Sequence, residues 1–157
     1  MFSALLALSF LASGSDDAEK RAEISSVRSD FDRNEGVVMF EKNVHVKYDK
    51  DYDLYADRVF VLLENTNQLS RIIALGHVSI TNQTRSGACH VAKFIKDKNE
   101  IEMYGDGKKG KPAVITDGDE GNELRGNVIR FWTDSEQIEV EKSCITIRQR
   151  VDKELVL

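Results

Sequence analysis

Cysteine is scarce in this sequence. Cys89 and Cys144 are the two in 157 residues, and neither belongs to a CxxC motif or to a cluster with histidine. Metal binding through cysteine is therefore not expected. The two residues could form a disulfide in an oxidising compartment, but a sequence does not supply the geometry that a disulfide requires. One disulfide and two unpaired thiols are both compatible with the sequence.

The sequence also has little proline and no excess of positive charge. One proline and ten glycines exclude a collagen-like chain or a proline-rich linker. The net charge of -5 and the sequence pI of about 5.3 argue against a nucleic-acid partner, which requires a basic stripe. The length suits one domain with a sizeable core.

The sequence offers no arrangement typical of an enzyme. His45, His77 and His90 fall in different predicted strands, with no serine or carboxylate at a spacing that suggests a catalytic triad. The segment GDGKKGKP (105–112) looks like a phosphate-binding loop, but Pro112 stands where a Ser or Thr would hold magnesium, and a strand follows it. We therefore expect a hairpin loop there, and we expect no metal, no cofactor and no catalysis.

Long hydrophobic runs are absent as well. The apolar stretch MFSALLALSFLASG (1–14) is shorter than the roughly 20 residues that a membrane-spanning helix needs. It fits the hydrophobic region of a secretory signal with a cleavage site after Gly14, and a buried N-terminal helix is the alternative. We predict a signal-peptide remnant in 1–14, a linker or short helix in 15–29 (the helix over 18–28), a β domain in 30–148 and a tail in 149–157.

Beyond residue 30, what the sequence has in abundance is alternation of apolar and polar residues. Valine and isoleucine are frequent, and polar clusters such as DKDYD, ENTNQ and TDSEQ separate the alternating segments, which is typical of β-strands. The pattern also repeats, and in the series Val44, Val78, Val114 and Ile145 the intervals are 31 to 36 residues. Intervals of this size are typical of stacked structural repeats.

The repeat forms three columns of apolar residues, and each keeps a two-residue step, so its members can share one face of a sheet. The first column contains Val44 and Val46, Val78 and Ile80, Val114 and Ile145; the second contains Val59 and Val61, Ala92 and Phe94, Ile129 and Phe131; the third contains Ile72 and Ala74, Ile101 and Met103, Ile138 and Val140. The columns predict three to four stacked rungs around a shared apolar interior. An ordinary β-sandwich is the alternative, although it has no reason to reuse one spacing.

The same segments carry a family resemblance. FEKNVHV (40–46), LYADRVFV (54–61), IIALGHVSI (72–80), GACHVAKFIKDKNEIEMYG (87–105), KPAVI (111–115) and LRGNVIRFWTDSEQIEVE (124–141) follow one another as in the LptA/OstA-like family of periplasmic lipopolysaccharide-transport proteins. The resemblance covers roughly residues 30–148. One departure is Lys42, which stands where the family usually has a glycine.

The resemblance implies an all-β fold, a stacked antiparallel β-jelly-roll that is open along one side and has a hydrophobic interior groove. It implies a periplasmic protein that shields the lipid A acyl chains of lipopolysaccharide between the inner and outer membranes. It also implies partners with similar β-jelly-rolls at both membranes, and head-to-tail self-association. On this basis we expect edge strands near VMFEKNVHV (38–46) and SCITIR (143–148).

The apolar columns predict which residues line the groove. We expect these lipid-facing residues to be Val44, Val46, Val59, Val61, Ile72, Val78, Ile80, Phe94, Ile101, Met103, Val114, Ile129, Phe131, Ile138, Val140 and Ile145.

Three other functions remain open. The chain could be the same kind of domain from another component of the pathway, either the membrane-anchored partner or the outer-membrane assembly protein. It could also be a structural β-solenoid that binds no lipid, which predicts a tightly filled interior. The small residues Ala56, Ala74 and Ala92 at inward positions favour room for a ligand instead. A glycan-cleaving β-solenoid comes last, because clustered acids are missing.

Overall fold

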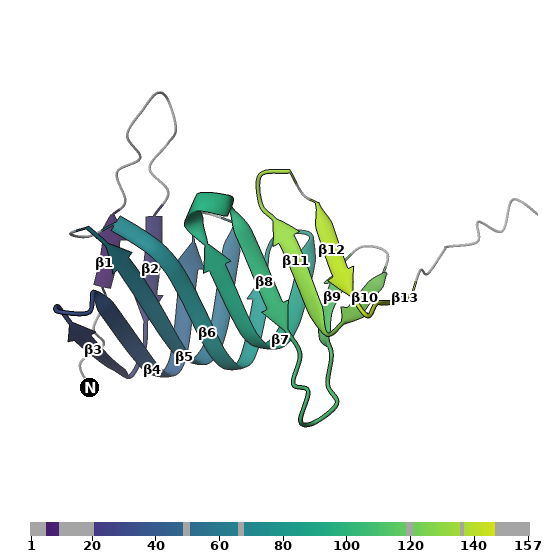
Figure 1. Ribbon diagram of the computed structural model, residues 1–157, viewed down its shortest axis with the longest axis horizontal. Coiled ribbons are helices and arrows are strands. Elements are labelled where there is room, and N and C mark those ends of the chain that lie inside the picture. The colour runs from purple at the N-terminus through teal and green to yellow at the C-terminus, as the bar shows by residue number, and fades with distance from the viewer. Residues whose placement is uncertain are drawn as a thin grey trace, which may run out of the picture.

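The computed structural model describes residues 6–9, 21–48, 51–65, 68–118, 121–135 and 137–146, and within them one antiparallel sheet of thirteen strands with one short 3-10 helix. The strands are β1 (Leu6–Ser9), β2 (Arg21–Ser25), β3 (Arg28–Asp32), β4 (Val37–Tyr48), β5 (Tyr52–Glu64), β6 (Gln68–Thr81), β7 (Arg85–Ile95), β8 (Glu100–Tyr104), β9 (Ala113–Asp117), β10 (Glu123–Gly126), β11 (Val128–Trp132), β12 (Ile138–Glu141) and β13 (Cys144–Thr146), and the 3-10 helix η1 is Lys96–Lys98. Figure 1 shows that the strands lie obliquely across the long axis of an elongated roll, with β1 to β3 at one end and β13 at the other.

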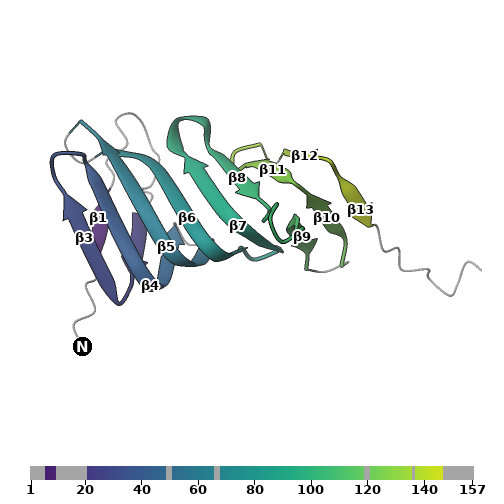
Figure 2. The same cartoon turned by 60° about the horizontal axis from the view of Figure 1, so that its bottom comes forward.

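The sheet folds back on itself along its length, so that it has two half-sheets. The main strand order is β1-β2-β4-β5-β6-β7-β8-β11-β12, with β3 beside β4, β9 beside β7 and β10, and β13 beside β10. The first half-sheet contains residues 37–41, 58–64, 68–75 and 91–95 together with β3, β8, β11 and β12; the second contains 44–48, 52–56, 78–81 and 85–89 together with β1, β2, β9, β10 and β13. Figure 2 shows the long strands β4 to β7 running through both.

Backbone bulges produce the bends between the half-sheets. The pairing register shifts between Glu41 and Val44 in β4 and between Leu75 and Val78 in β6. Residues with positive φ occupy both places: Lys42 (φ 65) with Asn43 (φ 50), and Gly76 (φ 78) with His77 (φ 47). A bulge of this kind bends its strand and increases the local twist. The family resemblance left Lys42 as a departure, and the lysine adopts the left-handed conformation that a glycine would adopt at less cost.

The interior between the half-sheets is apolar and most tightly filled near β2, β4 and β5. Ile24, Phe40, Val59 and Val61 are each 0% exposed there. Fully burying a side chain of this size contributes roughly 1.5–3 kcal/mol. A second and smaller cluster, around Met103, Ala113, Ile115 and Ile129, lies toward the C-terminal end of the roll. The expected all-β roll with an apolar interior is therefore confirmed.

The short helix expected over 18–28 is wrong where the structure describes the chain. Residues 21–25 form β2, residues 28–32 form β3, and both strands pair with β4. Ala22 and Ile24 are buried on one side of β2, so period-two burial overrides the helical propensity of AEKRAE. The sheet consequently begins before residue 30.

The expected edge strand near VMFEKNVHV (38–46) is also wrong. These residues belong to β4, which pairs with β2 and β3 on one side and with β5 on the other. This error and the wrong helix have the same origin, because no strand was predicted where β2 and β3 lie. Among the described strands, β1 and β3 are the edges at this end, and β12 and β13 are the edges at the other.

Of the predicted signal-peptide remnant, the structure describes Leu6–Ser9, which forms β1 antiparallel to β2. The signal peptide itself stays a prediction, and the predicted tail 149–157 lies outside the described residues. Within the described part of the chain, no helix is long and apolar enough to cross a membrane.

Candidate functional site

The strand register joins the second and third apolar columns of the sequence into two ladders on the inner face of the first half-sheet. Each ladder crosses six neighbouring strands, β5, β6, β7, β8, β11 and β12, one residue per strand. The first ladder is Val61, Ile72, Phe94, Ile101, Phe131 and Ile138, and the second is Val59, Ala74, Ala92, Met103, Ile129 and Val140. Directly opposite side chains in a sheet are in contact, so the ladders form a continuous apolar strip along the roll.

Fourteen of the sixteen residues predicted to line a groove face the interior. They are buried, pack against the buried clusters, or line the hollows described below: Val44, Val46, Val59, Val61, Ile72, Val78, Ile80, Phe94, Ile101, Met103, Ile129, Phe131, Ile138 and Val140. Ala56, Ala74 and Ala92 also face inward and are buried. That the strip meets a lipid stays a prediction.

Val114 was wrongly predicted to face inward. Its neighbours Ala113 and Ile115 are the buried residues of β9, and Ile115 pairs with Gly87 at the inner face of β7. Since successive residues of a strand point to opposite faces, Val114 lies on the outer face. For Ile145, the structure places the backbone opposite Leu124 in β10, and the side chain lies outside the described residues.

Two apolar hollows open between the half-sheets in the middle of the roll. They contain about 390 Å³ and about 520 Å³ of space not filled by protein atoms, the part open to solvent included. Tyr52, Ile80 and Ile101 line both hollows. The first is also lined by Asn82, Arg85, Ser86, Gly87, Met103, Ile115 and Phe131, and the second by Val46, Tyr48, Leu54, Ile72, Ala92, Lys93, Phe94 and Thr133.

Two contacts join the half-sheets where the hollows open. The rings of Tyr48 and Phe94 lie 5.3 Å apart between centroids, and the guanidinium carbon of Arg85 lies 5.9 Å from the ring centroid of Phe131. Sequence reasoning missed Tyr48, Tyr52 and Arg85. The signal for Tyr48 was present, because it continues the two-residue step of Val44 and Val46.

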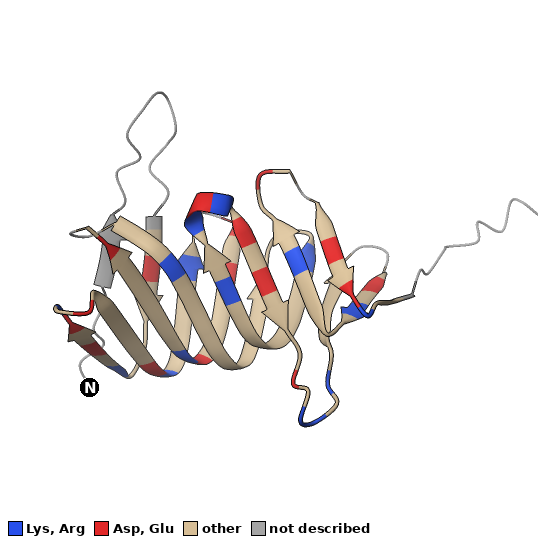
Figure 3. Cartoon of the chain, in the orientation of Figure 1, with Lys and Arg blue, Asp and Glu red and all other residues tan. Residues whose placement is uncertain are grey.

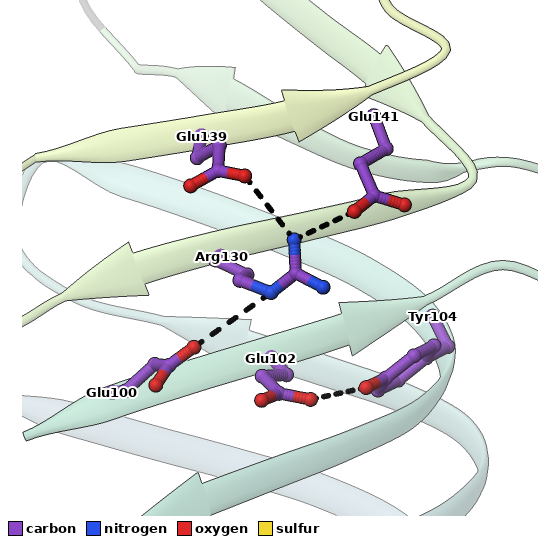
Figure 4. Close-up of polar contacts among 6 residues, drawn as sticks. All are labelled: Glu100, Glu102, Tyr104, Arg130, Glu139 and Glu141. Carbon is purple, nitrogen blue, oxygen red and sulfur yellow. Dashed lines mark hydrogen bonds and ion pairs between the residues drawn. The ribbon is translucent and has the colours of Figure 1, made fainter. Parts of the chain in front are cut away.

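The outer face of the first half-sheet carries charge instead. On the strands of the apolar ladders, Lys93, Glu102, Arg130 and Glu139 are successive register partners, and charges of both signs alternate on these strands in Figure 3. In Figure 4 the Arg130 guanidinium reaches Glu141 at 2.9 Å and Glu139 at 3.3 Å. The hydrogen bond to Glu141 raises the pKa of Arg130. The strip of sheet is therefore apolar inside and ionic outside.

Tyr104 ends the outer row of β8, where its hydroxyl donates a hydrogen bond to the Glu102 carboxylate (Figure 4). This hydrogen bond, with burial and the charge of Glu102, raises the pKa of Tyr104 to about 12. The phenol therefore stays neutral across the physiological range and serves as a donor on the outer face.

Both cysteines are free thiols in the structure. Cys89 packs partly buried against both apolar clusters, whereas Cys144 is exposed. Burial raises the pKa of the Cys89 thiol to about 12. The structure therefore favours the unpaired alternative.

Each histidine pairs with an aspartate rather than with a nucleophile. The pairs are His45 with Asp53 at 2.7 Å, His77 with Asp57 at 2.8 Å and His90 with Asp106 at 3.9 Å. Among the residues that the structure describes, no group of three or more His, Cys, Asp or Glu side chains is placed to hold a metal ion. The segment 105–112 is the expected hairpin loop, closed by the backbone bridge between Asp106 and Lys111.

A bent antiparallel sheet with an apolar inner strip and apolar hollows defines an open β-jelly-roll. A sequence model of the family described as LptA/(LptD N-terminal domain) LPS transport protein matches residues 23–137, and the chain belongs to this family. The family resemblance seen in the sequence is thereby confirmed.

The fold is similar to that of a solved structure, LptH, described as the LptA homologous periplasmic component of the conserved lipopolysaccharide transport device from Pseudomonas aeruginosa. The match has a TM-score of 0.69 at 12% sequence identity and covers 82% of this chain and 95% of that chain. No curated protein sequence matches the chain.

Proposed function

We propose that this chain is a periplasmic carrier that holds the acyl chains of lipopolysaccharide between its half-sheets while the lipid passes from the inner to the outer membrane. The observation that carries the proposal is the pair of apolar ladders next to two hollows of about 390 Å³ and 520 Å³. Membership of the lipopolysaccharide-transport family supplies the lipid class.

The energetic need for such a carrier is large. Exposing one methylene group to water costs about 0.8 kcal/mol, so an acyl chain of a dozen carbons costs on the order of 10 kcal/mol. An apolar strip offsets this cost wherever the chain lies along it. Because the ladders present apolar side chains on every strand from β5 to β12, a bound chain meets a continuous apolar surface along the roll.

The hollows also bear on the lipid-free structural solenoid. That alternative predicts a tightly filled interior, and the two apolar hollows lined by Tyr52, Ile80 and Ile101 support a ligand instead. The family description includes the N-terminal domain of LptD, so a place as the corresponding domain of an outer-membrane component is the second candidate. Recovery of the native protein from the soluble periplasmic fraction or from the outer membrane discriminates between the two.

We further propose that copies associate head to tail, or with similar β-jelly-rolls at either membrane, through strand edges. The edges β3 at one end and β12 with β13 at the other have unpaired backbone groups among the described strands, and such edges favour addition of another strand. The signal peptide predicted in 1–14 would deliver the chain to the periplasm.

The carrier proposal is tested by photo-crosslinking from two tyrosines of one strand. Tyr52 lines both hollows, whereas Tyr55 is 49% exposed on the outer face of β5 and stacks on His45. Each is replaced separately by benzoylphenylalanine in cells that make lipopolysaccharide. We expect a lipopolysaccharide adduct from position 52 and little or none from position 55. Equal yields from the two positions, or an adduct from position 55 alone, would refute an interior binding site.

A further inference from the structure

Arg85 occupies an unusual place for a cation, at the opening of the first apolar hollow. It is the first residue of β7, in the second half-sheet, and it lines that hollow beside Gly87 and Ile115. Its guanidinium carbon lies 5.9 Å from the ring centroid of Phe131, which belongs to β11 in the first half-sheet. Arginine stacks favourably on an aromatic face and is less strongly hydrated than lysine, which suits it to the border of an apolar cavity.

The turn before Arg85 fixes its backbone firmly. The Asn82 side-chain oxygen accepts hydrogen bonds from the backbone N–H groups of Thr84 at 2.9 Å and Arg85 at 2.7 Å. The Asn82 backbone N–H in turn donates to the Arg85 carbonyl oxygen at 2.9 Å. The guanidinium therefore starts from a defined position at the rim, and only its side-chain torsions are free to adjust.

No carboxylate of the described residues forms an ion pair with this guanidinium within 4.0 Å. Other arginines have acidic partners within 4.0 Å, among them Arg58 with Glu41 and Arg130 with Glu141. Arg85 has its ring contact with Phe131, and its register partner on β9, Asp117, forms no ion pair with it in the described part of the chain. A positive charge is thus left available where an apolar cavity meets solvent.

We propose that Arg85 binds a phosphate group of the lipid whose acyl chains occupy the hollows. The inference rests on the proposed carrier function and adds to it the residue that recognises the lipid head. Charge complementarity selects an anion at the rim, and the planar guanidinium can donate two parallel N–H bonds to phosphate oxygens. Phosphate binding exchanges the stacked position over Phe131 for a charge-assisted pair, while the acyl chains fill the space beneath.

The test compares phosphorylated lipid A with the same lipid A after enzymatic removal of its phosphates. Dissociation constants are measured by displacement of a fluorescent lipid from the wild-type chain and from Arg85→Gln, Arg85→Lys and Arg71→Gln. Arg71 is an exposed arginine on the outer face of β6 and serves as the matched control. Circular dichroism checks that each variant retains its sheet.

We expect the wild-type chain and Arg71→Gln to bind phosphorylated lipid A about tenfold more tightly than the dephosphorylated form, the size expected for a hydrogen bond to a charged group. Arg85→Gln should lose this preference and keep its affinity for the dephosphorylated lipid. Arg85→Lys should retain part of it, because the charge remains and the two-pronged geometry is lost.

Other results separate the two proposals. If Arg85→Gln weakens binding of both lipids equally, Arg85 has only a structural role and the inference is wrong. If Arg85→Gln retains the wild-type preference for phosphate, the inference is likewise wrong, although the carrier proposal survives. If the wild-type chain binds neither lipid, the carrier proposal itself is refuted. Tight binding of inorganic phosphate alone would assign the site to the free anion and overturn the lipid assignment.

Discussion

At the scale of single residues, the two cysteines are both free thiols but differ in solvent exposure. The Cys89 thiol lies against both apolar clusters, and burial raises its pKa to about 12, whereas Cys144 is exposed on β13. The thiolate is the reactive form of cysteine, so near neutral pH a group with this pKa reacts slowly. We therefore expect the exposed Cys144 thiol to react in the folded protein and the buried Cys89 thiol to react only when the fold opens.

We expect a thiol reagent at pH 8 to add one label to the native chain, at Cys144, and a second label only in denaturant. Intact-mass spectrometry counts the labels, and Cys144→Ser should remain unlabelled until it unfolds. A native chain that takes no label and weighs two hydrogens less than the reduced chain would instead show a disulfide.

The inner residues could largely be predicted from the sequence, because a strict two-residue step assigns them all to one face. Val114 shows where that logic fails. It lies in a run of three apolar residues, Ala113, Val114 and Ile115, and alternation alone cannot decide whether Val114 or its two neighbours face the interior. Pairing with β7 and β10 decides it. Arg85 was missed for a different reason, since its significance depends on a ring that comes 46 positions later in the chain.

At the scale of the strands, the bends are where sequence and conformation disagree most. Lys42 has φ 65 in the bulge of β4, a region that disfavours residues with a Cβ atom, and β6 uses Gly76 at its corresponding bulge. At Gly76 an added Cβ would also lie 2.5 Å from a side-chain oxygen of Asp57. The position in β6 thus favours glycine, while β4 tolerates the strain of a lysine.

We expect Lys42→Gly to raise the free energy of unfolding by about 1 kcal/mol, because it removes that strain. Lys47→Gly in the same strand, at an exposed position where no positive φ occurs, should lower it by roughly 0.5–1 kcal/mol. Urea titration followed by the fluorescence of the single tryptophan, Trp132, measures both. A destabilised Lys42→Gly variant would mean that contacts of the lysine side chain outweigh the backbone strain.

The strands β2 and β3 mark the limit of prediction at this scale. AEKRAEISSVR has good helix formers and little alternation, so the sequence favours a helix there. The fold overrides that preference because Ala22 and Ile24 fill the end of the interior opposite β4. Partners far away in the chain supply the pairing energy, and a local pattern cannot contain that information.

At the scale of the whole molecule, the hydrogen-bond pattern of β12 shows which backbone groups are available to another copy. The Trp132 N–H donates to the Gln137 carbonyl oxygen, so Arg130 with Glu139 is also a hydrogen-bonded pair and Ile129 with Val140 is not. The Val140 N–H consequently points away from β11, toward the free edge.

We expect Val140→Pro to keep its sheet, because the lost N–H faces outward, and to reduce concentration-dependent self-association. Glu139→Pro removes a hydrogen bond to β11 and should destabilise the fold instead. Light scattering over a range of concentrations measures association, and circular dichroism measures the sheet. Association of a folded Val140→Pro variant at the wild-type level would count against a contact at β12.

The continuity of the backbone gives the roll a built-in polarity. Four strands, β4 to β7, pass unbroken from one half-sheet into the other, whereas beyond them each half-sheet is made from its own short strands. Near the N-terminal end, separating the two half-sheets would require bending all four of these continuous strands at once. Toward the C-terminal end, three connections join the half-sheets instead: the 105–112 loop, Asn127, and Lys142 with Ser143. The loop is the longest of the three, so we expect the half-sheets to separate first beside it.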